Sequence, residues 1–173
     1  MDLLQHLAPV SAGYATLPVR DAFNWQETAA GLGDGDWYLV AFRSIRRAGA
    51  DEERLTLFDE LAHQEAATSP GFIHYFKGPQ ADDGSCLSFC LWQSRADARA
   101  AAGRPDHVRA VSLIDEMYES YTLEFHRVTR AAGGPLTFDA YDRGPAHGAP
   151  ALHPISVGPV AALSLAIRPA AAG

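Results

Sequence analysis

The run WYLVAFRS at residues 37–44 opens the stretch of sequence that decides the fold, and the run YTLEFHRV at residues 121–128 closes it. Both runs are rich in aromatic and β-branched residues, which is typical of β-strands. Between them the chain shows an acidic helical segment, two further strand-like runs and a broken helix. Residues 36–130 therefore predict a βαββαβ unit, an α+β fold with a four-stranded antiparallel sheet that packs helices on one face and must cover the other.

Local signals place the elements inside this unit. The acidic run at residues 51–53 predicts the start of the first helix, where negative charge suits the positive end of the helix dipole. Turn residues join the strand-like runs 71–77 and 85–92, which predicts an antiparallel hairpin. Ser94 is expected to cap a second helix, which breaks and then resumes to about residue 120 before the fourth strand.

The unit is flanked by two extensions. Residues 1–35 form an N-terminal arm that contains Phe23 and Trp25. Because aromatic side chains are unfavourable in water, we expect this arm to pack on the domain or on a second subunit. Residues 131–173 are rich in proline, glycine and alanine, which predicts a mostly irregular C-terminal extension with room for one short strand. The chain is thus expected to hold one domain, at residues 36–130, between the two extensions.

Charge and hydropathy restrict the partners. The chain of 173 residues has a net charge of −7 and a pI near 5.4. Nucleic acids and anionic membranes attract clusters of cations, so neither is an expected partner. The N-terminus lacks the pattern of a secretory signal, and no segment has the roughly 20 apolar residues of a membrane span. We therefore expect a soluble, cytoplasmic protein that binds small molecules or other proteins.

Both cysteines of the chain, Cys86 and Cys90, lie in one predicted strand. Residues four apart on a strand share a face but lie about 13 Å apart, which is too far for a disulfide. Two reduced thiols are expected. A metal site would need further soft ligands nearby, so no metal is predicted.

One sequence feature resembles a known family. The run Trp92-Gln93-Ser94 leads into a broken helix that carries Pro105-Asp106-His107. This arrangement resembles the dimeric α+β barrel superfamily, in particular the antibiotic-biosynthesis-monooxygenase type of domain. The resemblance implies a ferredoxin-like unit, a homodimer in which two sheets join into a barrel, and a small-molecule pocket between sheet and helices. Members include cofactor-free oxygenases, haem-degrading enzymes, isomerases, lyases and proteins with no demonstrated activity.

Within such a pocket, His107 is the candidate catalytic residue. A histidine on a helix that faces the sheet acts as a general base or as an axial ligand of haem iron. The alternative is a partly exposed histidine at a helix start. Trp92, Ser94 and Tyr118 are the candidate pocket walls and hydrogen-bond partners.

Two more candidates depend on which face of the sheet they occupy. His74 alternates with Phe72 and Phe76, so the three are expected to share a face. If that face lines the pocket, His74 is a second base or ligand. If it meets the sheet of another subunit, His74 is an interface residue. Arg43 would pair with a ligand carboxylate if it points inward, whereas its neighbours at 46–47 favour a solvent-facing cluster.

Two other histidines are not expected to take part in function, and the family resemblance provides the functional hypotheses. His63 is interpreted as a surface group, and His126 shares an exposed or interfacial face with Thr122 and Glu124. The leading hypothesis is a small-molecule enzyme that resembles cofactor-independent monooxygenases and acts on an apolar or aromatic compound. The alternatives are a haem-binding or haem-degrading protein and a non-catalytic dimeric binding module.

Overall fold

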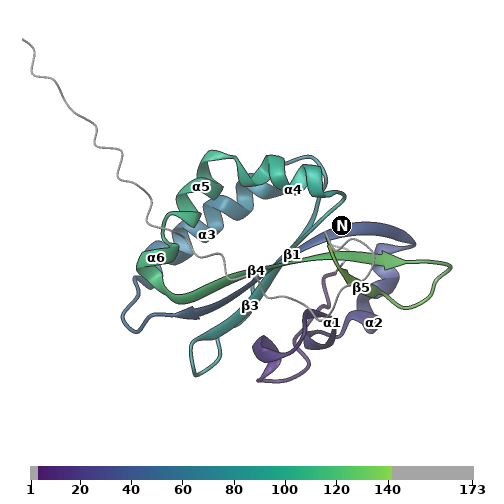
Figure 1. The fold of residues 1–173 in the computed structure, drawn as a ribbon, viewed down its shortest axis with the longest axis horizontal. Coiled ribbons are helices and arrows are strands. Elements are labelled where there is room, and N and C mark those ends of the chain that lie inside the picture. The colour runs from purple at the N-terminus through teal and green to yellow at the C-terminus, as the bar shows by residue number, and fades with distance from the viewer. Residues whose placement is uncertain (1–3, 142–173) are drawn as a thin grey trace, which may run out of the picture.

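The structure is a computed structural model that describes residues 4–141. Its strands form one sheet, with a layer of helices on one face and the N-terminal arm on the other (Figure 1). Within these residues, no helix has both the length and the apolar character needed to cross a membrane. The elements in chain order are η1 (Tyr14–Thr16), α1 (Val19–Ala22), α2 (Trp25–Thr28), η2 (Ala29–Leu32), β1 (Gly35–Arg46), α3 (Glu52–Ala67), β2 (Phe72–Phe76), β3 (Ser85–Trp92), α4 (Arg95–Ala102), α5 (Pro105–Val111), α6 (Ile114–Met117), β4 (Tyr118–Arg130) and β5 (Thr137–Ala140).

The strand order β2-β3-β1-β4-β5 gives the unit its topology, and every neighbouring pair is antiparallel. The first four strands and their intervening helices follow the βαββαβ order, with β1 between β3 and β4, which is the ferredoxin-like arrangement. The prediction of this α+β fold is confirmed, as is the hairpin of β2 and β3. The expected four-stranded sheet is extended by β5, the short strand for which the sequence left room.

Both predicted helices begin with a side-chain cap, and of the two caps only that of Ser94 was predicted. The side chain of Asp51 accepts a hydrogen bond from the backbone N–H of Arg54 (3.0 Å) at the start of α3. The hydroxyl of Ser94 accepts one from the backbone N–H of Asp97 (3.2 Å) at the start of α4. Each cap satisfies a backbone donor that a helix N-terminus leaves without an intrahelical partner.

The boundary between the last helix and the fourth strand differs from the prediction. The helical pattern was expected to run to about residue 120, but α6 ends at Met117 and β4 begins at Tyr118. Tyr118 pairs with Arg46 at the end of β1, across a bulge. Aromatic residues favour β-strands, and this pairing extends β4 into a segment that was predicted to be helical.

A second correction concerns β2. The register shifts between Phe72 and His74, so that Phe72 pairs with Trp92 while His74 pairs with Leu91. An extra residue in one strand reverses the alternation of faces beyond it. Phe72 therefore packs on the helical side, whereas His74 and Phe76 lie on the opposite side against Phe89. The three residues do not share a face.

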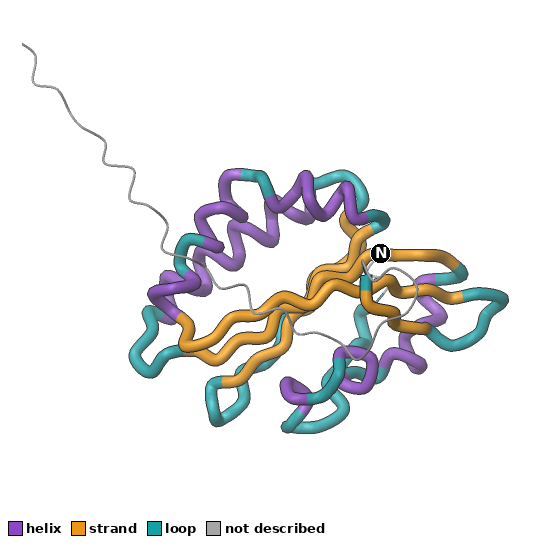
Figure 2. The backbone as a smooth tube through the Cα atoms, in the orientation of Figure 1, coloured by secondary structure: helices purple, strands orange, loops and turns teal. Residues whose placement is uncertain are grey.

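The N-terminal arm covers the face of the sheet that the helices leave open (Figure 2). The indole N–H of Trp25 donates to the backbone carbonyl of Val19 (2.8 Å), which orders α1 and α2 against each other. This is the face on which the sheets of a dimeric barrel would join. The N-terminal arm already occupies part of this face. The homodimer stays a prediction. The buried cluster joins the arm side chains Leu4, Leu7, Tyr14, Val19, Phe23 and Trp25 to Trp37, Leu39, Leu87, Phe89, Leu91 and Val128 of the strands.

Candidate active site

A cavity of about 770 Å³ lies between the sheet and the helices α3 to α6. Because side chains alternate along a strand, one set of residues from β1 and β3 faces this cavity and the other set faces the arm. The cavity is mainly apolar, and its volume is in the range of small-molecule sites. Its sheet wall includes Tyr38, Val40, Phe42, Ser44, Cys90 and Trp92.

Three of the residues expected at the pocket line this cavity. They are His107 on α5, Trp92 at the end of β3 and Tyr118 at the start of β4. Burial lowers the pKa of His107, and the nearby carboxylate of Glu65 only partly opposes this effect. The imidazole is therefore neutral at pH 7 and keeps a nitrogen lone pair that can accept a proton.

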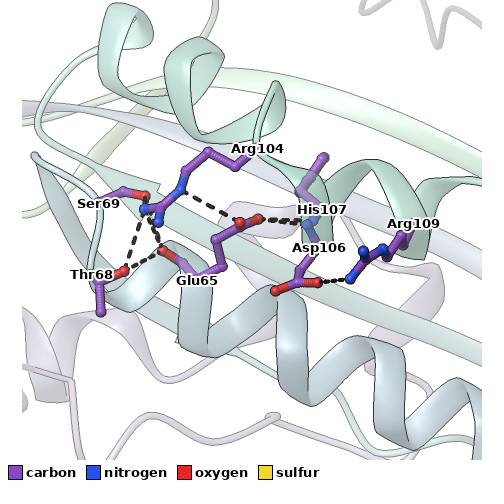
Figure 3. Close-up of polar contacts among 7 residues, drawn as sticks. All are labelled: Glu65, Thr68, Ser69, Arg104, Asp106, His107 and Arg109. Atoms are coloured by element: carbon purple, nitrogen blue, oxygen red, sulfur yellow. Dashed lines mark hydrogen bonds and ion pairs between the residues drawn. The ribbon is translucent and has the colours of Figure 1, made fainter.

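A carboxylate from the neighbouring helix fixes the position of His107. One oxygen of Glu65 accepts hydrogen bonds from the backbone N–H groups of Asp106 and His107, both at 3.0 Å (Figure 3). Arg104 donates to the Glu65 backbone carbonyl (2.9 Å) and to the Ser69 hydroxyl (2.7 Å), which ties the end of α3 to the start of α5. The negative charge of Glu65 at the N-terminus of α5 is also favourable for the helix dipole. His107 thus projects from a helix whose first turn is held by two side chains.

The other three expected site residues lie outside the cavity lining. Ser94 caps α4 and also donates to the carboxylate of Asp97 (2.6 Å). His74 lies near Phe89 on the arm side because of the bulge in β2. Arg43 is on the arm side by simple alternation, so it points away from the cavity. The condition for a ligand contact of Arg43 or His74 in this cavity is therefore not met.

Arg43 instead belongs to a polar cluster beneath the arm. Its guanidinium contacts the carboxylate of Glu124 and donates to the backbone carbonyls of Ala15 and Leu17, the latter at 2.6 Å. The other oxygen of Glu124 lies 3.2 Å from Nε2 of His126. Burial by itself raises the pKa of Glu124, but the hydrogen bonds from His126 and Arg43 outweigh it and hold that pKa below the usual value. The face expected to be exposed or interfacial is thus covered by the chain's own arm.

Comparison with known proteins gives the family. Residues 1–139 match the PB2B2.08-like family. The chain belongs to this family. The match includes the N-terminal arm together with the βαββαβ unit, and no curated protein matches the sequence significantly.

Solved structures that are similar to this chain match about half of its length at low sequence identity. SnoaB from Streptomyces nogalater, described as a cofactor-independent oxygenase, is 15% identical, with a TM-score of 0.43, over 56% of this chain and 94% of its own. NE2512 from Nitrosomonas europaea is 16% identical, with a TM-score of 0.48, over 57% and 95%. A dimeric ferredoxin-like protein from Thermobifida fusca is 15% identical, with a TM-score of 0.44, over 53% and 90%.

The cavity also contains polar groups that were not predicted from the sequence. Tyr75 donates to the carboxylate of Asp59 (2.6 Å), and Nζ of Lys77 lies 2.7 Å from the same carboxylate. His63 lines the cavity with its ring 4.9 Å from that of Tyr75, so its interpretation as a surface group was wrong. The missed signal was helical spacing, since residues 59, 63 and 66 follow Leu55 on one face of α3.

Cys86 and Cys90 both line the cavity, as expected for residues four apart on a strand, and neither forms a disulfide. Burial raises the pKa of Cys90 to about 12, which keeps its thiol protonated and unreactive as a nucleophile. In the part of the chain that the structure describes, no group of three or more His, Cys, Asp or Glu residues is arranged to hold a metal ion. His107 is the candidate base of the cavity, whose lining also includes Asp59 and His63.

Proposed function

We propose that this protein is a small-molecule enzyme that resembles cofactor-independent monooxygenases and acts on an apolar or aromatic compound in the cavity between sheet and helices. One observation supports this most directly. The ring of His107 lines a mainly apolar cavity of about 770 Å³, and burial holds it in the neutral form that a general base requires.

The proposed reaction begins with proton transfer to His107. The imidazole removes a proton from a CH₂ group that is activated by conjugation with a ketone through aromatic rings, and leaves a delocalised carbanion. Dioxygen adds to that carbon and takes back the proton, which gives a hydroperoxide. Loss of water then converts the carbon to a carbonyl, so that CH₂ and O₂ become C=O and H₂O. Apolar walls favour this sequence because they exclude bulk water from the anion.

Replacement of His107 by alanine tests this role. We expect the variant to lose at least about 100-fold in oxygen uptake with anthrone as the probe, because positioned acid–base groups contribute about 10²–10⁴-fold. The usual pKa of histidine is about 6.5, and that of His107 is lower. Activity of the native protein should therefore persist below pH 6.5 and fall as the pH drops through the lowered pKa of His107. Initial rates measured by an oxygen electrode across pH give both results.

Val108 provides the matched control for this experiment. It follows His107 on α5, is 54% exposed and does not line the cavity. Val108→Ala should retain native rates, and far-ultraviolet circular dichroism should be the same for both variants. Full turnover in a folded His107→Ala variant would remove this histidine from the mechanism.

Haem is the alternative ligand, because His107 and His63 both line the cavity and a neutral imidazole is an axial ligand of haem iron. Under the leading proposal, haem titrated into the protein gives no Soret shift that saturates at one equivalent per chain. A saturating shift that disappears in His107→Ala or His63→Ala would favour the haem-binding alternative. The third hypothesis, a non-catalytic module with an interior filled by side chains, is not favoured by a cavity of this volume.

A further inference from the structure

Three hydrogen-bond donors gather where β1 ends and β4 begins, and all three residues line the cavity. Arg46 and Tyr118 are direct partners across the two strands, and Tyr121 lies opposite Ser44 on the same face. The rings of Tyr118 and Tyr121 meet edge to face with their centroids 5.3 Å apart. The bulge next to Arg46 brings these side chains to the cavity end nearest α6.

In the part of the chain that the structure describes, each of these side chains has a donor that no protein acceptor uses. Nε of Arg46 is buried and has no hydrogen-bond partner, although another guanidinium nitrogen pairs with Glu52. Among residues 4–141, the hydroxyls of Tyr118 and Tyr121 also make no hydrogen bond, whereas the hydroxyl of Tyr75 is bonded to Asp59. Both tyrosines line the cavity, so an acceptor on a ligand there can bond to hydroxyls that the protein leaves without one.

The electrostatics of this group select the type of acceptor. Burial raises the pKa of both Tyr118 and Tyr121, so each phenol keeps its proton and donates. The Arg46 guanidinium supplies positive charge beside them, and because Arg46 pairs with Tyr118 across the strands, it partly opposes the rise of the Tyr118 pKa. A cation with two neutral donors suits an oxygen anion better than a neutral carbonyl.

We propose that Arg46, Tyr118 and Tyr121 form an oxyanion-binding subsite, so that the ligand is an apolar ring compound carrying a carboxylate or a phenolate-type oxygen. This inference rests on the proposed use of the cavity and names the substrate class. The apolar body of the ligand lies along the aromatic wall toward Trp92. The arginine that serves the ligand is Arg46 on the cavity face, in place of Arg43.

A pair of probes that differ in charge tests the subsite. We expect 2-naphthoate to bind at least about tenfold more tightly than 2-naphthamide, because hydrogen bonds to a charged group are about twice as strong as neutral ones. Arg46→Gln and the double variant Tyr118→Phe with Tyr121→Phe should each abolish this preference and leave 2-naphthamide affinity unchanged. Isothermal titration calorimetry gives both dissociation constants.

The controls separate the subsite from general effects. Arg47→Gln removes the adjacent cation, which is exposed and does not line the cavity, and should keep the preference. Arg46→Lys keeps the charge but lacks the planar guanidinium that can donate two parallel hydrogen bonds, so it should fold as the native protein does and lose most of the preference. Glu52→Gln removes the competing carboxylate of Arg46 and should strengthen 2-naphthoate binding.

A third probe, 2-naphthol, distinguishes the two sources of the oxyanion. If the subsite takes phenolates, bound 2-naphthol ionises at a lower pH than free 2-naphthol in the native protein but not in Arg46→Gln, as its fluorescence reports. If it takes carboxylates alone, only the naphthoate preference is seen. Equal binding of naphthoate and naphthamide, with no shift for naphthol, would overturn the subsite and leave the cavity as a ligand site. Binding of none of the three would overturn both proposals.

Discussion

Replacing Trp25 with alanine is expected to lower the free energy of unfolding by about 3–5 kcal/mol. Trp25 is only 2% exposed, and its ring lies 5.1 Å from those of Phe89 and Phe138 and 5.5 Å from that of Phe23. The substitution removes these contacts and leaves the carbonyl of Val19 without its indole donor. The arm would then detach more readily from the sheet.

Urea denaturation followed by circular dichroism measures this loss. Val10→Ala is the control in the same arm, since Val10 is 53% exposed, and it should change stability by less than about 0.5 kcal/mol. A loss below about 1 kcal/mol for Trp25→Ala would contradict the packing of the arm on the strands.

The second large effect is expected at the pair of Arg43 and Glu124, whose side chains are 18% and 13% exposed. Glu124→Ala leaves a largely buried guanidinium without its counter-charge and should cost about 3 kcal/mol of unfolding free energy at pH 7. Because the folded-state pKa of Glu124 is lowered, this stabilisation is complete above the usual glutamate pKa and is lost as pH falls through the lowered value. Native stability should therefore drop more steeply in acid than that of Glu124→Ala.

A double-mutant cycle isolates the pair. Arg43→Met with Glu124→Ala should lose less stability than the sum of the two single variants, because both remove the same interaction. Arg20→Ala, at an exposed pair with Asp21, is the matched control and should have little effect. Simple additivity in the cycle would show that the pair makes no net contribution.

The strands and helix caps could be predicted because their signals are local. Residues 85–92 were assigned as a strand from composition alone, and Ser94 was assigned as a cap from its position before a helical run. The pocket position of His107 depended on the resemblance to a known family. Tyr118 shows the limit of local signals, since it lies at helical spacing but is drawn into β4 by its partner Arg46.

Sheet faces were harder to assign, for two physical reasons. Arg43 and Arg46 were treated as one cluster, although odd and even positions of a strand point to opposite faces, so this difference could have been derived from the sequence. The placement of His74 could not, because the bulge after Phe72 depends on pairing with β3. The sheet face on which the arm packs could not be predicted either. Apolar side chains such as Trp25 indicate that the arm is buried, but they do not indicate the surface that buries it.

The arm precedes in the chain every strand that it covers, and this order has a consequence for synthesis. Phe23 and Trp25 leave the ribosome long before Leu87 and Phe89 of the strand on which they pack. Their docking surface is complete only after β4 has joined β1, so the nascent chain carries exposed aromatic rings until β4 has been synthesised. The arm is thus synthesised before the strands that bury it.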